Sequence, residues 1–241
     1  MKVLPEQIAA TLSDRVIHGS YPPGHRLIEA ALSQEFGVSH GPIRDALRIL
    51  QASGLVTIHP YRGARVTQLS VREVRELYEV RAALVSIRAR WIAEDPQPHR
   101  AKILELVEAR IARLAALADD EQNAEEFSDE SAAVNNLLTD SLPNRWLRST
   151  IQAITLQTSR YSRLALVGSR ERRQEAAQLW RMLFNAMASG DADLAEKVGA
   201  TLSLTARDAA IKYLNEHASE PVPERPAPRT RRLKIVGGKT P

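Results

Sequence analysis

The sequence of 241 residues contains no cysteine. That absence excludes a disulfide-stapled scaffold, thiol catalysis and any metal site with thiolate ligands. No apolar run approaches the ~20 residues needed to cross a membrane, and the first residues lack the apolar core of a signal peptide. Aromatic side chains make up only 5% of the chain, whereas alanine and leucine are abundant, which favours helices over sheets. We therefore expect a mainly α-helical, cytoplasmic protein with no membrane partner.

Motifs of the common enzyme classes are also missing. The sequence has no nucleophile elbow, no P-loop, no glycine-rich dinucleotide-binding loop and no HExxH pair. Clustered acids occur at 119–121 and 129–130, but both lie at expected helix starts, where carboxylates interact favourably with the helix dipole. We predict that the chain is not an enzyme.

The net charge of +4 is unevenly distributed. Residues 1–68 carry seven basic and five acidic side chains, and residues 219–241 carry six basic and two acidic ones. The centre is slightly negative and is therefore not a body that binds polyanions. Any contact with nucleic acid is expected to come from the ends of the chain.

Residues 30–50 read as two short helices joined at Gly37. A tight link between two helices often needs a residue that is free to take a positive φ. Ser39 is a suitable N-cap for the second helix, and Pro42 fits its first turn, where the missing N–H costs nothing. This is the arrangement by which a helix-turn-helix presents a recognition helix to the major groove of DNA.

The flanking residues extend this unit to a winged helix-turn-helix domain over residues 1–69. A helix is expected over 5–18, and β-type residues near 56–58 and 66, on either side of a turn at 60–63, predict a two-stranded wing. Arg44 is expected to reach a base edge and Arg62 a phosphate. The predicted DNA contacts are Ser39, His40, Gly41, Arg44, Arg48, Arg62, Gly63 and Arg65.

From Ser70 the pattern changes to long amphipathic helices. Ser70 and Glu73 form a capping-box pair at the start of the first one. Helices are predicted over about 70–93, 99–118, 124–141, 144–167, 170–188 and 191–217. We expect an antiparallel helical bundle over residues 70–218, followed by a disordered basic, proline-rich tail over 219–241.

Two arginines fall on the apolar stripe of the first bundle helix, which comprises Val74, Leu77, Leu84 and Trp91. A buried cation needs an anionic partner. One hypothesis is that Arg81 and Arg88 form structural salt bridges with a neighbouring helix. The other is that Arg81 binds the carboxylate of a ligand, because its fork geometry suits bidentate pairing.

Polar side chains also fall on the inward stripe of the third bundle helix, which comprises Phe127, Ser131, Val134, Leu138 and Leu142, with Asn135 beside it. Ser131 and Asn135 are one turn apart, and either bond to backbone groups or face a ligand. Trp180 of the fifth helix is either core or the wall of a cavity. Gln157, Arg160 and Tyr161 of the fourth helix are further candidates.

Several stretches resemble a known family. YPPGHRLIE at 21–29, FGVSHGPIRDAL at 36–47 and RGARV at 62–66 resemble the DNA-binding domain of the GntR family of bacterial transcription regulators. LYEVR at 77–81 and AMASGDADLA at 186–195 resemble the FadR-type, or FCD, effector domain. The resemblance implies a transcription regulator, commonly a repressor, that binds a palindromic operator as a homodimer and holds a small effector, usually a carboxylate, in the bundle.

The sequence departs from this family pattern at both specificity sites. Relatives often carry Arg and Thr where this chain has His40 and Gly41, which leaves Arg44 as the clear base contact. Many relatives also hold a divalent metal with one Asp and three His, and the matching positions here are Ser131, Asn135, Trp180 and Leu202. A hydroxyl, an amide, an indole and an alkyl chain do not form a transition-metal site, so we predict no metal cofactor.

The predicted ligand-binding residues are Arg81, Ser131, Asn135, Trp180, Leu202 and Tyr161. A second hypothesis stays open at this point. Loss of the metal ligands also fits a regulator or architectural DNA-binding protein without a small-molecule effector.

Overall fold

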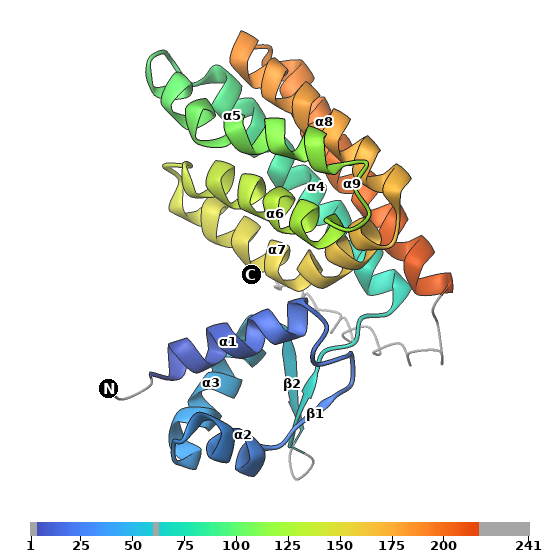
Figure 1. Cartoon of the computed structure of the whole chain (residues 1–241). Coiled ribbons are helices and arrows are strands. Elements are labelled where there is room, and N and C mark those ends of the chain that lie inside the picture. Colours follow the sequence, from blue (N-terminus) through green and yellow to red (C-terminus); the bar gives the residue numbers. More distant parts are fainter. Residues whose placement is uncertain (1–3, 60–62, 217–241) are drawn as a thin grey trace, which may run out of the picture.

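The computed structural model describes residues 4–59 and 63–216 and has two helical bodies joined in one chain (Figure 1). The predicted tail over 219–241 and the predicted contact Arg62 lie outside the described residues. None of the helices in the described part of the chain is long and apolar enough to cross a membrane.

The first body is the winged helix-turn-helix that the sequence predicts. Its elements are α1 (Pro5–Ile17), β1 (Arg26–Leu27), α2 (Glu29–Phe36), α3 (His40–Ala52), β2 (Val56–His59) and β3 (Gly63–Val66). Gly37 ends α2 in the left-handed conformation, with φ of 64°, as the tight turn requires. Ser39 is the N-cap residue of α3, although its side chain makes no capping hydrogen bond.

The small sheet has three strands rather than the two that the sequence predicts. The strand order is β1-β3-β2, with antiparallel pairing of Arg26 with Arg65 and of Val56 with Val66. The prediction missed β1 because two residues are too short to show an alternating pattern. This strand fixes the base of the wing against the segment that leads into α2.

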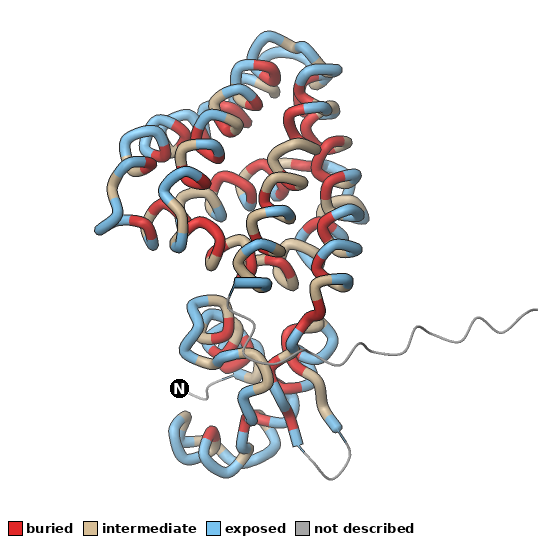
Figure 2. The backbone as a smooth tube through the Cα atoms, turned by 90° about the vertical axis from the view of Figure 1, so that its right-hand side faces the viewer, coloured by how far each residue is buried: buried red, intermediate tan, exposed pale blue. Residues whose placement is uncertain are grey.

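The second body is an antiparallel helical bundle, as predicted. Its helices are α4 (Val71–Glu94), α5 (His99–Leu117), α6 (Ala124–Asp140), α7 (Arg145–Val167), α8 (Arg170–Ser189) and α9 (Ala192–Glu216). The predicted capping box at the start of α4 is confirmed: the backbone N–H of Glu73 donates to the Ser70 side chain, and the Glu73 carboxylate accepts from the Ser70 backbone. Figure 2 shows buried residues on the helix sides that face one another.

The inward face of α4 was predicted only in part. Val74 and Arg88 are buried as expected, but Trp91 is 41% exposed. The residues buried on this helix include Tyr78, Val85, Ala89 and Ile92. Leu77 and Leu84 are half-buried. The prediction that Trp91 faces the core is therefore wrong, because α4 carries two apolar stripes and periodicity alone does not rank them.

The inward stripe of α6 is confirmed more fully. Phe127, Val134 and Leu138 are completely buried, and Leu142 is nearly so. Ser131 is half-buried. These residues belong to cores that α6 shares with its neighbours, and α6 packs against α5 and α7.

Candidate functional site

The leading end of α3 is open to solvent. Ser39, His40, Gly41, Arg44 and Arg48 are all exposed, because the other side of the helix buries Ile43, Ala46, Leu47 and Leu50 in the domain core. An exposed helix face of this kind can enter the major groove.

The two arginines of α3 have acidic partners in their own domain. Arg44 Nε donates to Oε2 of Glu29 at 2.8 Å, and Arg48 Nη1 donates to Oδ1 of Asp45 at 3.2 Å. The Nε contact leaves the terminal Nη1 and Nη2 atoms of Arg44 free for a base edge. Arg44 is therefore oriented before DNA arrives.

The other predicted DNA contacts differ from one another in their hydrogen-bond partners and exposure. His40 Nδ1 lies 3.5 Å from the Ser33 hydroxyl. Arg65 is exposed but donates from Nη1 to the Gly24 carbonyl, so its guanidinium also braces the wing. Gly63 is exposed at the start of β3 with a φ of 78°.

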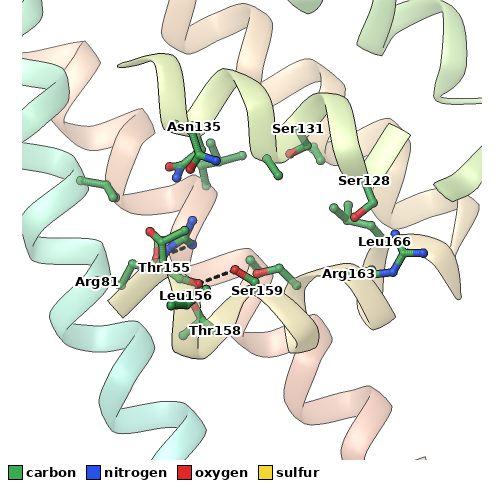
Figure 3. Close-up of a pocket in the computed structure, with 18 of the residues that line it drawn as sticks. Arg81, Ser128, Ser131, Asn135, Thr155, Leu156, Thr158, Ser159, Arg163 and Leu166 are labelled. Carbon is green, nitrogen blue, oxygen red and sulfur yellow. Dashed lines mark hydrogen bonds between the residues drawn. The ribbon is translucent and has the colours of Figure 1, made fainter. Parts of the chain in front are cut away.

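A cavity of about 520 Å³ lies inside the helical domain (Figure 3). Helices α4, α6, α7, α8 and α9 all contribute to its wall. Of the predicted ligand-binding residues, it brings together Arg81, Ser131, Asn135, Trp180 and Leu202. A volume of this size suits a small organic ligand.

Trp180 and Ser131 are linked across this cavity. The indole Nε1 of Trp180 donates to the Ser131 hydroxyl at 2.9 Å. Among the described residues, the Ser131 hydroxyl makes no hydrogen bond to a backbone group, which contradicts the alternative that it bonds to the backbone. Trp180 is 3% exposed, so it belongs to the core and also lines the cavity.

Arg88 is the most buried charged side chain of the cavity, at 1% exposure. Its Nη1 donates to the Asn135 carbonyl and Oδ1 and to the Thr139 hydroxyl, at 3.0, 2.9 and 2.7 Å. Burial lowers the pKa of Arg88 to about 9, and the nearby charge of Arg81 adds to this effect. The guanidinium therefore stays charged at neutral pH without a carboxylate partner.

Arg81 has no carboxylate partner either. Its Nη1 donates to the Ser203 hydroxyl at 3.4 Å, and its guanidinium lies 5.7 Å from the ring centre of Tyr78. Burial also lowers the pKa of Arg81. The expectation that Arg81 and Arg88 form structural salt bridges is wrong, since no acidic group in the described part of the chain lies within ion-pair distance of either.

Several polar atoms of the cavity residues have no hydrogen-bond partner among the described residues. They are Arg81 Nε, Arg88 Nε, Asn135 Nδ2 and Thr155 Oγ1. Buried polar groups are normally paired, so these unpartnered atoms are compatible with a polar ligand. The Nε atoms of Arg100, Arg160 and Arg173, which lie outside the cavity, are unpartnered among the described residues too, so the set does not by itself mark a ligand site. Three of the four are nitrogen donors, which favours a ligand rich in acceptor oxygens.

Tyr161 does not line the cavity, so its predicted role in ligand binding is wrong. Its hydroxyl accepts a hydrogen bond from the Leu69 backbone N–H at 3.0 Å, at the start of the helical domain. Arg160 donates from Nη1 to the carbonyls of Val16 and Tyr21, at 3.0 and 2.9 Å. Arg160 thus joins the two domains, whereas Tyr161 bonds to the residue at which they meet.

Gln157, the third of these candidates, faces the DNA-binding domain as well. Gly54 has a φ of 80°, and a Cβ atom placed there would lie 2.8 Å from the Gln157 Cδ. The positive φ favours glycine at position 54, whereas the flexible end of the Gln157 side chain could move away from a Cβ atom. Gln157 therefore contacts the DNA-binding domain and does not line the cavity.

The four positions where the resemblance implies a metal do converge on the cavity. They are Ser131, Asn135, Trp180 and Leu202. Their side chains offer no imidazole and no carboxylate, which divalent metals of this class prefer. Within residues 4–59 and 63–216, no cluster of three or more His, Asp or Glu could hold a metal ion. The donor set does not fit the implied metal.

Comparison with known proteins agrees with this architecture. Residues 4–66 match the bacterial regulatory proteins of the gntR family, and residues 76–202, more than half of the chain, match the FCD domain. The chain belongs to the GntR family. As a GntR regulator with an FCD domain, it is a metabolite-controlled DNA-binding transcription regulator and not an enzyme.

Two relatives and one solved structure illustrate the range of similarity. The galactonate operon transcriptional repressor of Escherichia coli K12 is 28% identical over 218 residues, which cover 82% of this chain and 92% of the repressor. The regulator YdhC of Bacillus subtilis is 32% identical over 94 residues, or 39% of this chain and 42% of YdhC. The structure of E. coli McbR/YncC has a TM-score of 0.72 at 18% identity and covers 90% of this chain and 100% of that one.

Proposed function

We propose that this GntR regulator is a repressor whose cavity binds a small hydroxylated carboxylate of the sugar-acid class. The observation that carries the proposal is the pair Arg81 and Arg88, two cations that line the cavity and have no acidic partner among the described residues. Arg88 is buried and Arg81 is half-buried. A carboxylate would supply the missing negative charge and acceptor oxygens.

The rest of the wall suits hydroxyl groups. Serine and threonine side chains line the cavity, namely Ser128, Thr155, Thr158, Ser159, Ser162 and Ser203. Thr158 and Ser159 donate to carbonyl groups of their own helix, so their oxygens can accept from the alcohol groups of a polyhydroxy acid. The name of the E. coli galactonate operon repressor points to the same class of compound.

A thermal-shift panel tests this proposal. D-Galactonate, D-gluconate and neutral D-galactose are added to the full-length protein, with Arg81→Met as the test variant and Arg75→Met as the control. Arg75 is exposed on the same helix and does not line the cavity. The acids should raise the Tm of the wild type and of Arg75→Met, whereas Arg81→Met should lose the shift and galactose should give none. If none of the acids shifts the Tm of the wild type, a regulator without a small-molecule effector would be favoured.

The protein is further proposed to act as a homodimer. One side of α4 carries apolar residues at helical spacing. They are Val80, Leu84, Ile87 and Trp91, which are four, three and four residues apart. Val80 is 51% and Trp91 41% exposed. α7 packs beside α4 and exposes Trp146. Two copies joined by this apolar face would present two α3 helices to a palindromic operator.

Light scattering on a size-exclusion column tests the dimer. Trp91→Glu should convert the dimer to a monomer, because it buries a charge in the proposed interface. Leu106→Glu is the control, since Leu106 is 56% exposed on α5, away from this face. Equal masses for the two variants would overturn the assignment of the interface.

Two minor proposals complete the functional account. The regulator is proposed to need no metal, because its four matching positions lack suitable ligands. Its operator lies on chromosomal DNA in this proposal, so its place of action is the cytoplasm.

A further inference from the structure

The cavity of the helical domain is not closed by that domain alone. Asp14, Ile17 and His18, which lie at the end of α1 in the DNA-binding domain, also line it. α1 lies against the bundle at α7 (Figure 1). Sequence analysis missed these three residues, because nothing in a sequence shows that a residue of one domain reaches the cavity of another.

The contacts between the end of α1 and the helices α6 and α7, here called the seam, involve charged side chains. His18 Nε2 lies 3.5 Å from Oδ1 of Asp129 on α6, and Arg163 Nη1 of α7 lies 3.5 Å from the same oxygen. The side chain of Asp14 is 75% exposed, so most of its carboxylate surface remains accessible. The seam therefore offers carboxylate acceptors to a ligand that reaches it.

The two sides of the cavity differ in charge. Arg81 lies on one side of the view in Figure 3, and Arg163 lies on the opposite side. Within the described residues, Arg81 and Arg88 have no carboxylate partner, whereas Arg163 pairs with Glu125 and Asp129. A ligand with a carboxylate at one end and hydroxyl groups along the rest would match both sides: its carboxylate would accept from the arginines, and its hydroxyls would donate to the seam aspartates.

α1 is firmly attached to the recognition helix. Ile8, Leu12 and Val16 of α1 share one buried core with Ile43 and Leu47 of α3. Leu156 of α7 both lines the cavity and packs against this core. A ligand that contacts the end of α1 would therefore act on the rigid unit that contains α3.

We propose that the effector site is shared by the two domains, with Asp14 of the DNA-binding domain contacting the hydroxyl end of a ligand whose carboxylate binds at Arg81. The inference rests on the proposed sugar-acid ligand. It makes Asp14 a ligand-binding and specificity residue. A ligand that contacts both domains would favour the arrangement in which α1 lies against α7 over any other arrangement, and such a difference in affinity is the requirement for allosteric control.

Calorimetric titration of D-galactonate into the full-length protein tests the contact. A hydrogen bond to a charged group corresponds to about tenfold in affinity, so Asp14→Ala should weaken D-galactonate binding about tenfold or more. Glu6→Ala is the matched control, because Glu6 is an exposed acid of α1 that does not line the cavity. Its affinity should equal that of the wild type. Equal affinities for Asp14→Ala and Glu6→Ala would overturn the shared site.

A second measurement needs no ligand. The chain has three tryptophans, so Trp91→Phe with Trp146→Phe leaves Trp180 of the cavity as the only fluorophore of its kind. If α1 walls the cavity, Ile17→Ala in this background should increase acrylamide quenching of Trp180. Ile49→Ala, at an exposed position of α3, should leave it unchanged. Unchanged quenching in Ile17→Ala would overturn the shared site.

The two measurements separate the inference from the proposed function. If the wild type binds no D-galactonate but Ile17→Ala increases quenching, the sugar-acid ligand is wrong and the shared cavity stands. If D-galactonate binds and the Asp14 substitution has no effect, the ligand class stands and the shared site is wrong.

Discussion

Arg44 and Glu29 form an ion pair on the surface that is predicted to face DNA, with 2.8 Å between Arg44 Nε and Glu29 Oε2. The two residues come from different helices, α3 and α2, so the pair ties the recognition helix to the helix before it. Exposed ion pairs contribute little to stability. The Arg44–Glu29 ion pair instead matters because it orients the guanidinium of Arg44.

The Arg44–Glu29 pair predicts two different mutant phenotypes. Arg44→Ala should cost ~1–3 kcal/mol of discrimination at one base pair of a selected operator, because a bidentate contact to guanine is lost. Glu29→Ala should keep the affinity for DNA of any sequence but relax discrimination at the same base pair, since Arg44 is no longer held. Fluorescence anisotropy with the selected duplex and with its single-base variants measures both. Full discrimination in Glu29→Ala would show that the ion pair does not position Arg44.

Arg160 is predicted to hold the DNA-binding domain against the bundle. Arg160→Met removes two hydrogen bonds to the carbonyls of Val16 and Tyr21 and should destabilise that contact by ~1–3 kcal/mol. Hydrogen exchange of the last turn of α1 should accelerate accordingly. Arg145→Met, at an exposed position of the same helix, serves as the control. Identical exchange in the two variants would mean that α1 is held by other contacts.

Gly54→Ala is predicted to destabilise the protein by more than about 1 kcal/mol, because alanine is strained at a φ of 80° and the end of the Gln157 side chain must move to make room for the new Cβ atom. Denaturant unfolding measures the loss. Adding Gln157→Ala to Gly54→Ala should restore the share of the lost unfolding free energy that comes from the contact with Gln157. The share that comes from the positive φ should remain lost. A double variant no more stable than Gly54→Ala would exclude the steric contribution of Gln157.

Metal removal is predicted to have no effect. A hydroxyl, an amide, an indole and an alkyl side chain stand at the four positions implied by the family resemblance, so EDTA should leave the Tm of the full-length protein unchanged, and added Zn²⁺ or Ni²⁺ should not raise it. Differential scanning calorimetry measures both. A lower Tm in EDTA, reversed by one of these ions, would contradict the prediction.

The helix boundaries were the most predictable part of this protein. Breakers such as Pro96, Gly168 and Gly190 and the capping pair Ser70 and Glu73 are local signals, and they place the ends of the bundle helices within a residue or two. The two-residue strand β1 was not predictable, because its pairing with β3 depends on a partner nearly forty residues away.

The cavity was predictable only where one helix contributes a periodic face. Arg81, Ser131, Asn135 and Trp180 were found in this way, and they do line it. Tyr161 was misassigned because α7 has two polar faces, one toward the cavity and one toward the DNA-binding domain. Which face meets which partner depends on how the domains pack, and periodicity does not contain that information.

The central claim is that a carboxylate bound at Arg81 controls DNA binding. Its most direct test is the operator affinity of the full-length protein with and without D-galactonate, in wild type and in Arg81→Met. We predict that the acid changes wild-type operator affinity by about 5–150-fold, the usual range of allosteric coupling, and does not change the affinity of Arg81→Met, although this variant binds the operator equally well without the acid. An equal response in the two proteins, or none in the wild type, would contradict the account.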